Sequence, residues 1–291
     1  MKKSELTLDI LFQKVFEKHW DTARFNASGH AKEVARLYSS KIHPSFGEKP
    51  AAEITRHHVR DWHESMKHTP IEANRALVIL SATYQKALEL EFIETQNPCI
   101  FVKHFTEKRR NRYASDVEIG KLFASLMGLK EEEPLAAVLL LTVLFTGARP
   151  QSLWKLSWDN LRGGRITFHG KGSSKNGEPE VLIVSKEIVD MWRSLTKRSD
   201  SLIFGKVMYQ PLWEKVSAEA GCPDLWARDL RRTFATVGMS SGIKMDTISE
   251  LLNHKSVQTT KLYAKLNDDA RVEASSAISN KISEIVKRSS T

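Results

Sequence analysis

The sequence predicts a mainly α-helical protein with a small β-sheet, an α+β fold divided into two domains. Apolar residues recur at spacings of three and four over most of the chain, as on one face of a helix. Two short apolar or alternating runs flank a turn rich in glycine and lysine, which is typical of a β-hairpin. The length of 291 residues is enough for two hydrophobic cores.

Residues 1–106 are expected to form an all-helical domain. Four apolar stripes at helical spacing predict its helices, and the breaks fall at His43-Pro44 and Asn97-Pro98. No alternation typical of a strand occurs in this part of the sequence. The stripes are Leu8, Leu11, Phe12, Val15 and Phe16; Val34, Leu37 and Tyr38; residues 54–66; and residues 71–90 with Leu77, Leu80, Tyr84, Ala87 and Leu88 facing inward.

A basic linker is expected over residues 103–112. Five cations and a single acid, Glu107, crowd into these ten residues. Such a run is either a solvated linker or a strap that lies along the phosphates of a polyanion, and the sequence leaves both open. The cations are Lys103, Lys108, Arg109, Arg110 and Arg112.

The second domain is expected over residues 107–291. Ser115 and Glu118 form a capping box that starts its first helix. A buried helix follows over residues 135–145, where the apolar run of 11 residues is too short to cross a bilayer. Residues 165–169 and 180–184 predict a β-hairpin or a small meander, and the pattern is helical again from Lys186. Residues 264–291 predict a tail helix, with Ile278, Ile282 and Ile285 at roughly helical spacing.

Composition indicates a soluble protein with a polyanionic partner. The formal net charge is +9, and a surplus of this size favours nucleic acid as the partner over a protein that is merely basic. Cys99 and Cys222 lie far apart and form no CxxC pair, which is typical of a reducing compartment. With no signal peptide in view, the expected location is the cytoplasm, on nucleoid or host DNA, with no membrane partner.

The sequence contains none of the usual metal or nucleotide motifs. There is no GxxxxGK[ST] loop, no HExxH pair, no paired-cysteine set and no obvious carboxylate cluster. We therefore expect no metal and no cofactor. If the protein acts on phosphodiesters, cationic side chains and a protein nucleophile must do the chemistry.

Such a set of side chains is present in the second half of the chain. Arg149 follows Thr146-Gly147-Ala148 just past the buried helix, where glycine permits a tight turn. Arg228 and Arg231 are spaced by three, so both lie on one helical face. His254 ends a helix, and Tyr263 follows nine residues later.

These segments resemble the motifs of the tyrosine recombinases, the phage integrase family. TGARPQSLWKLSW is similar to their first arginine box, ARDLRRTFAT to their H-x-x-R box and LLNHKSVQTTKLYAKL to their terminal histidine and tyrosine box. RNRYASDVEIGKL is similar to the opening of their catalytic domain. A single box would be weak, but four in the family's order are specific. The likeness covers residues 107 to about 266 and, more loosely, the helical domain, which would then be the core-type DNA-binding domain.

The resemblance implies a site-specific recombinase or integrase of a phage or mobile element. Tyr263 would attack phosphorus and form a 3′-phosphotyrosyl bond, without metal or ATP. Arg149 and Arg231 would hold the two non-bridging oxygens with charge-assisted hydrogen bonds, and His254 would donate to a phosphoryl oxygen.

A hairpin lysine would protonate the leaving 5′-oxygen, as in the family. Two candidates stand in the predicted turn, Lys171 and Lys175. The distance back from the strand Val181-Leu182-Ile183-Val184 favours Lys175, and the choice stays open.

Two positions depart from the family pattern. Arg228 stands where the family commonly has histidine, and arginine cannot accept a proton at neutral pH. Ser152 stands where an acid usually follows the first arginine by three positions, so the support which that acid gives must come from elsewhere.

The implied partners are double-stranded DNA and three further copies of the chain. We expect a monomer alone and a homotetramer on paired DNA sites, and accessory DNA-bending proteins are a further class that the resemblance allows. Two other functions stay open: relaxation of DNA by a type IB topoisomerase, and DNA binding by a regulator without catalysis. The tryptophans expected in the core rather than on DNA are Trp154, Trp158, Trp192, Trp213 and Trp226.

Overall fold

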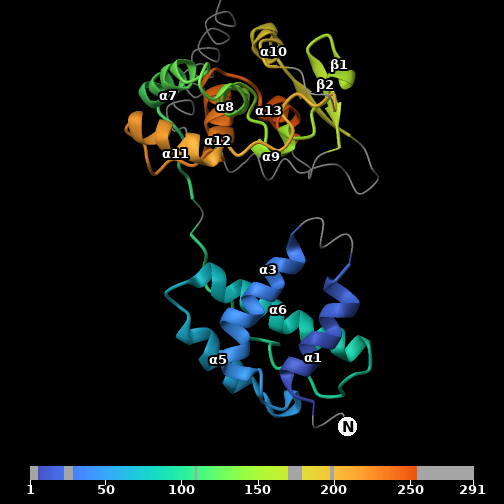
Figure 1. Cartoon of the computed structure of the whole chain (residues 1–291). Helices are drawn as coiled ribbons and strands as arrows, with labels where there is room; N and C mark the ends of the chain where they lie inside the picture. Colours follow the sequence, from blue (N-terminus) through green and yellow to red (C-terminus); the bar gives the residue numbers. More distant parts are fainter. Residues whose placement is uncertain (1–5, 23–28, 109, 170–178, 197–199, 254–291) are drawn as a thin grey trace, which may run out of the picture. The chain divides into compact units, whose positions relative to one another are not determined.

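The computed structural model describes residues 6–22, 29–108, 110–169, 179–196 and 200–253 (Figure 1). By their internal contacts the residues divide into two compact units, Met1–Arg109 and Arg110–Thr291. The division lies three residues beyond the boundary of 106 and 107 that the sequence suggested.

Among its described residues the first unit has helices as its regular elements and no strand, as predicted. Each of the four apolar stripes forms a helix, and one turn of π-helix extends each of the first two, which their periodicity did not indicate. The elements are α1 (Leu8–Val15), η2 (Phe16–Trp20), α3 (His30–Leu37), η3 (Tyr38–Ile42), α4 (His43–Phe46), η4 (Ala51–Glu53), α5 (Arg56–Ser65) and α6 (Pro70–Glu89).

Helix α6 is the centre of this unit (Figure 1). It packs against α1, α3 and α5, and its residues Leu77, Leu80 and Tyr84 are buried. The Tyr84 hydroxyl donates to the Ala51 carbonyl oxygen at 2.8 Å, so the buried phenol is satisfied.

The start of the predicted linker belongs to the first unit. The Asn74 side chain on α6 accepts from the Phe105 backbone N–H at 2.9 Å and donates to the Phe105 carbonyl at 2.9 Å. It also donates to a Glu107 carboxylate oxygen at 2.8 Å. The ring of His63, on α5, stacks on Phe105 with 4.2 Å between centroids. Residues 105–107 are therefore held by side chains of the helical unit.

The second unit places the predicted buried helix at its centre (Figure 1). Helix α8 contacts α7, α10, α11 and α12, and its residues 136–144 are all buried. The Trp192 indole N–H donates to the Thr142 hydroxyl at 2.8 Å inside this core. The helices are α7 (Asp116–Gly128), α8 (Pro134–Thr146), α9 (Pro150–Leu153), η5 (Trp158–Asn160), α10 (Lys186–Arg193), α11 (Gln210–Glu219), α12 (Asp229–Ser240) and α13 (Met245–Leu251).

The predicted hairpin is present as part of an antiparallel sheet in the order β1-β2-β3. Strand β2 (Arg165–Phe168) pairs with β3 (Glu180–Ile183), and a short β1 (Leu161–Arg162) pairs with β2. The hairpin is thus extended to a small meander, although the residues of its first strand were not predicted. The register sets Phe168 opposite Glu180. The turn with Lys171 and Lys175 lies outside the described residues.

The predicted capping box is confirmed at the start of α7. The Ser115 hydroxyl accepts from the Glu118 N–H, and the Glu118 carboxylate accepts from the Ser115 N–H at 2.8 Å. Arg112 donates to the same carboxylate at 3.0 Å and to Asp224 at 2.8 Å. These bonds to Arg112 and to Ser115 lower the pKa of Glu118 to about 2.

The arginines at the end of the basic run are paired with acids of the second unit. Arg112 is bound as above, and Arg110 donates to the Asp229 carboxylate at 2.9 Å. The Arg110 guanidinium also lies 4.3 Å from the centre of the Trp226 ring. These two arginines are therefore anchors between parts of one unit.

Trp226 corrects one expectation about the core. It is 59 % exposed, because its position before α12 leaves the ring covered by the Arg110 guanidinium and not by apolar side chains. Trp192 and Trp213 are buried as predicted, and Trp154 and Trp158 are partly buried. Within the described ranges, no helix is both long and apolar enough to span a membrane.

Candidate active site

A glycine brings three elements of the second unit together. Gly147 ends α8 with φ at +64°, a backbone conformation that glycine adopts without strain. A Cβ atom at this position would lie 2.6 Å from Leu252 and 2.8 Å from Phe234. The absence of a side chain therefore lets the end of α8 meet both α12 and the residue after α13.

Arg231 binds these three elements to one another. Its side chain is on α12 and is buried, with 8 % exposure. One guanidinium nitrogen donates to the Gly147 carbonyl at 2.8 Å, and the other terminal nitrogen donates to the Leu252 carbonyl. Because burial removes the hydration of a cation, an unpartnered guanidinium here would destabilise the fold, and these carbonyl oxygens replace the lost water. The first and second arginine boxes thus meet around one guanidinium.

Arg149 lies two residues beyond Gly147, at the N-cap of α9. Its side chain is 39 % exposed, so part of the guanidinium reaches solvent. Its Nη1 is 3.7 Å from Oε2 of Glu180, the first residue of β3, whose side chain is 5 % exposed. That distance makes an ion pair without a hydrogen bond. A partly exposed guanidinium has five N–H donors, which is enough to bind an anion as well as to face one carboxylate.

Asn253 fixes the end of α13 to the hairpin. Its side-chain oxygen accepts from the Val181 N–H at 3.2 Å, and its side-chain nitrogen donates to the Val181 carbonyl at 2.7 Å. Its backbone has φ at +49°, which asparagine tolerates better than most residues. Sequence reasoning missed this residue. Its place directly after the helix and before His254, where a left-handed residue often stands, was the available signal.

The two departures from the family pattern lie close to this arrangement. Arg228 is exposed at the N-cap of α12, one turn before Arg231. Ser152 is buried on α9, and its backbone N–H donates to the Arg149 carbonyl at 2.9 Å. Helix α9, with the sequence PQSL, has no acid, so the carboxylate beside Arg149 comes from β3.

The remaining predicted site residues lie outside the described residues. These are Tyr263, His254 and the two lysine candidates, Lys171 and Lys175. The structure does describe their chain neighbours: His254 directly follows the fixed Asn253, and the lysines belong to the segment between β2 and β3. In the part of the chain that is described, no group of three His, Cys, Asp or Glu side chains gathers as for a metal ion.

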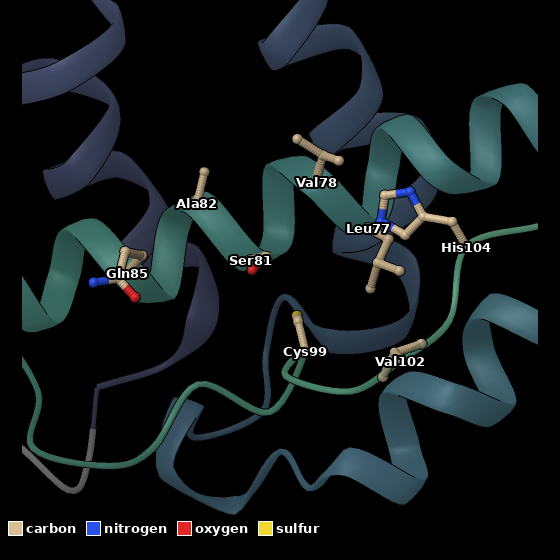
Figure 2. Close-up of a pocket in the computed structure, with 8 residues that line it drawn as sticks. All are labelled: Leu77, Val78, Ser81, Ala82, Gln85, Cys99, Val102 and His104. Carbon is tan, nitrogen blue, oxygen red and sulfur yellow. The ribbon is translucent and has the colours of Figure 1, made fainter.

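A groove in the first unit shows no comparable chemistry (Figure 2). It has a volume of about 350 Å³ and lies beside α6, with Leu77, Val78, Cys99 and His104 among its lining residues. Burial raises the pKa of the Cys99 thiol to about 12, so the sulfur stays protonated and is a poor nucleophile. The arginines of the second unit remain the candidate site.

The guanidiniums of Arg149 and Arg231 lie where α8, α12, α13 and β3 meet. Such cationic side chains are suited to binding an oxyanion. Comparison with known proteins agrees with a site of this kind. Residues 117–270, just over half of the 291, match the phage integrase family. The chain therefore belongs to the phage integrase family, whose members are tyrosine recombinases.

Individual relatives have a low sequence identity to this chain. The integrase of Escherichia phage P2 is 26 % identical over 200 residues, which are 67 % of this chain and 55 % of that protein. The tyrosine recombinase XerA of Saccharolobus solfataricus is 25 % identical over 271 residues, 87 % of this chain and 89 % of the relative. The chain thus spans little more than half of one relative and most of the other.

Solved structures confirm the predicted fold. A lambda integrase fragment, bound as a dimer to a COC′ core site, has a TM-score of 0.71 at 15 % identity. The match covers 89 % of this chain and 95 % of that one. A lambda integrase tetramer bound to a Holliday junction also has a TM-score of 0.71, covering 91 % of this chain and 78 % of the other. The mainly helical architecture with a small antiparallel sheet is therefore that of an integrase.

Proposed function

We propose that this protein is a site-specific DNA recombinase that cleaves and rejoins strands through a covalent bond to Tyr263. The observation that carries the proposal is the meeting of the first arginine box, at the end of α8, with the second, on α12, and with the end of α13. Arg231 joins Gly147 to Leu252, Arg149 follows Gly147 by two residues, and His254 follows Leu252 by two. Family membership supports the same activity and does not favour the topoisomerase or the non-catalytic regulator.

The chemistry is an exchange of one phosphoester for another. The Tyr263 oxygen attacks phosphorus while the bond from phosphorus to the 5′-oxygen breaks, which leaves a 3′-phosphotyrosyl bond and a 5′-hydroxyl. Arg149 and Arg231 stabilise the charge on the non-bridging oxygens, and His254 donates to one of them. Because the number of phosphoesters is unchanged, the strand is rejoined by the reverse reaction without ATP.

Protons must enter and leave at two atoms. Lys175 donates to the leaving 5′-oxygen, with Lys171 as the alternative. The phenol proton leaves by a route other than Arg228, since a guanidinium does not accept a proton at neutral pH. Arg228, exposed at the start of α12, contributes a hydrogen bond to phosphate instead.

The substrate is double-stranded DNA, and the working assembly is a homotetramer on paired sites. Solved relatives that share the fold are bound to DNA, one of them as a tetramer on a Holliday junction. The protein acts in the cytoplasm on nucleoid or host DNA, for a phage or another mobile element. It is a monomer without DNA, so a stable tetramer seen by light scattering in the absence of DNA would contradict this assembly.

A nicked suicide duplex carrying the native site tests the proposal. Cleavage releases a short 5′-hydroxyl strand that diffuses away, so the covalent complex accumulates and its peptide can be mapped by mass. We expect the adduct on the peptide that contains Tyr263, no adduct for Tyr263→Phe, and a normal amount for the control Tyr113→Phe. Binding without any adduct in the wild type would favour a regulator, and an adduct on another residue would assign a different nucleophile.

The same duplex decides between the lysines. We expect Lys175→Ala to abolish cleavage and Lys171→Ala to retain it. Sulfur in place of the bridging 5′-oxygen leaves without a proton, so it should restore cleavage to Lys175→Ala. If Lys171→Ala is the inactive variant and is the one restored by sulfur, then Lys171 is the acid.

A further inference from the structure

A buried carboxylate stands beside the exposed arginine of the site. The Glu180 side chain is 5 % exposed, and its Oε2 lies 3.7 Å from Nη1 of Arg149. Arg149 itself is 39 % exposed. The acid therefore lies beside Nη1 of a guanidinium that is partly open to solvent.

Hydrogen bonds on two sides of β3 determine the position of Glu180. On one side, Glu180 is paired with Phe168 of β2. The next residue, Val181, has its N–H and its carbonyl bound by the Asn253 side chain. Glu180 is thus tied through its strand to β2 on one side and, through Val181, to the end of α13 on the other.

A carboxylate at this buried position lowers the stability of the fold, so its presence suggests a function. Alternate residues of a strand face the same side, and Glu180 shares its side with Leu182, which is 2 % exposed. Apolar residues are the usual occupants of such positions, because a buried carboxylate loses its hydration. The charge of Arg149 offsets part of that loss.

We propose that Glu180 is the positioning residue for Arg149, in place of an acid on α9. The position on α9 one turn after Arg149 is Ser152, which has no charge. Glu180 reaches the same guanidinium from β3 and holds its inner edge, so that the outer N–H groups point to the scissile phosphate. The separation is too long for a hydrogen bond, so Arg149 can close on phosphate without breaking one.

This inference rests on the proposed function and makes a prediction that a purely structural role does not. Removal of the negative charge leaves the site more cationic, so DNA binding should be unchanged or tighter. The guanidinium loses its orientation at the same time, so cleavage should slow by roughly 10- to 100-fold, the effect of a misplaced catalytic group. A structural role would weaken binding, rate and thermal stability together.

The experiment compares Glu180→Gln, which keeps the shape, with Glu180→Asp, which keeps the charge, and with the exposed control Glu187→Gln on α10. Single-turnover cleavage at saturating suicide duplex gives the rate, and titration of the uncleaved duplex gives the dissociation constant. We expect Glu180→Gln to be slow with an undiminished affinity, Glu180→Asp to recover part of the rate, and Glu187→Gln to match the wild type. A Glu180→Gln rate equal to that of the wild type overturns the proposal.

A double-mutant cycle with Arg149→Lys tests whether Glu180 acts through the arginine. We expect Glu180→Gln to slow the Arg149→Lys protein by less than about threefold, because coupled residues are not additive. Equal losses in both backgrounds would overturn the proposal. If the wild type forms no adduct, the proposed function fails, but the NMR signal of the Arg149 side-chain Nε–H still tests the positioning. We expect this signal to be sharp in the wild type and broadened in Glu180→Gln. An unchanged signal rejects the positioning role of Glu180.

Discussion

At the scale of residues, the site depends on one position that has no side chain. Gly147→Ala would require alanine to adopt the left-handed backbone conformation and would place its Cβ 2.6 Å from Leu252 and 2.8 Å from Phe234. The left-handed backbone costs about 1 kcal/mol, and forced packing costs about 1–3 kcal/mol more. We expect the free energy of unfolding to fall by about 2–4 kcal/mol, measured by urea denaturation.

A matched control lies in the same unit. Gly120 is inside α7, has no atoms within 4 Å of a built Cβ, and is not in the left-handed region. Gly120→Ala should raise the free energy of unfolding by up to about 1 kcal/mol, because alanine favours the helix. If both substitutions have the same effect, the close approach at Gly147 is not limiting.

At the scale of elements, His63 couples the stability of the first unit to pH. Its ring is 3 % exposed, stacks on Phe105 and is within 3.2 Å of the Asn74 side-chain oxygen. Burial is the largest cause that lowers the pKa of His63 below 6.5. The unfolded chain therefore takes up the proton first, so the stabilisation is complete above pH 6.5 and is lost as the pH falls through the lowered pKa.

We expect the thermal midpoint of the wild type to fall between pH 7 and pH 5 by more than that of His63→Gln. Both midpoints follow from circular dichroism, and the difference between them isolates His63 from the other groups that titrate. His57→Gln, at an exposed position of the same helix, should show the full wild-type pH dependence. An identical pH dependence in His63→Gln and the wild type would contradict the coupling.

At the scale of the whole molecule, the net charge of +9 should make DNA binding steeply dependent on salt. Each neutralised phosphate contributes about −0.9 to the slope of log affinity against log salt, so several contacts reduce affinity by about a thousandfold between 50 and 200 mM. Lys108→Ala should reduce the slope by about 1 if this exposed cation contacts phosphate. Filter binding at several salt concentrations measures both slopes.

Arg112→Gln is the informative comparison in this series. The Arg112 guanidinium donates to Glu118 and Asp224, so it is already neutralised by protein carboxylates. We expect its removal to leave the slope nearly unchanged while it lowers stability by about 2 kcal/mol. If Arg112→Gln reduces the salt dependence of DNA binding as much as Lys108→Ala does, then Arg112 leaves Glu118 and Asp224 and contacts phosphate when DNA binds.

The sequence by itself determined most of the helices, the hairpin and the family. The helical stripes, the capping box of Ser115 and Glu118, the hairpin and the four boxes are patterns between residues close in the chain, and such patterns express local backbone and burial preferences. For the same reason, the residues implied by the boxes could be named without coordinates, and the roles of Tyr263, His254 and Lys175 remain predictions.

Tertiary structure alone decided which side chains meet. Arg231 reaches Gly147 across 84 residues of sequence, Asn253 reaches Val181 across 72, and Arg110 reaches Asp229 across 119. The pairing of Arg149 with Glu180 is of the same kind and replaces an acid that the local pattern lacks at Ser152. No local preference encodes such contacts, because they depend on how the packed core sets the distances between elements remote in the chain.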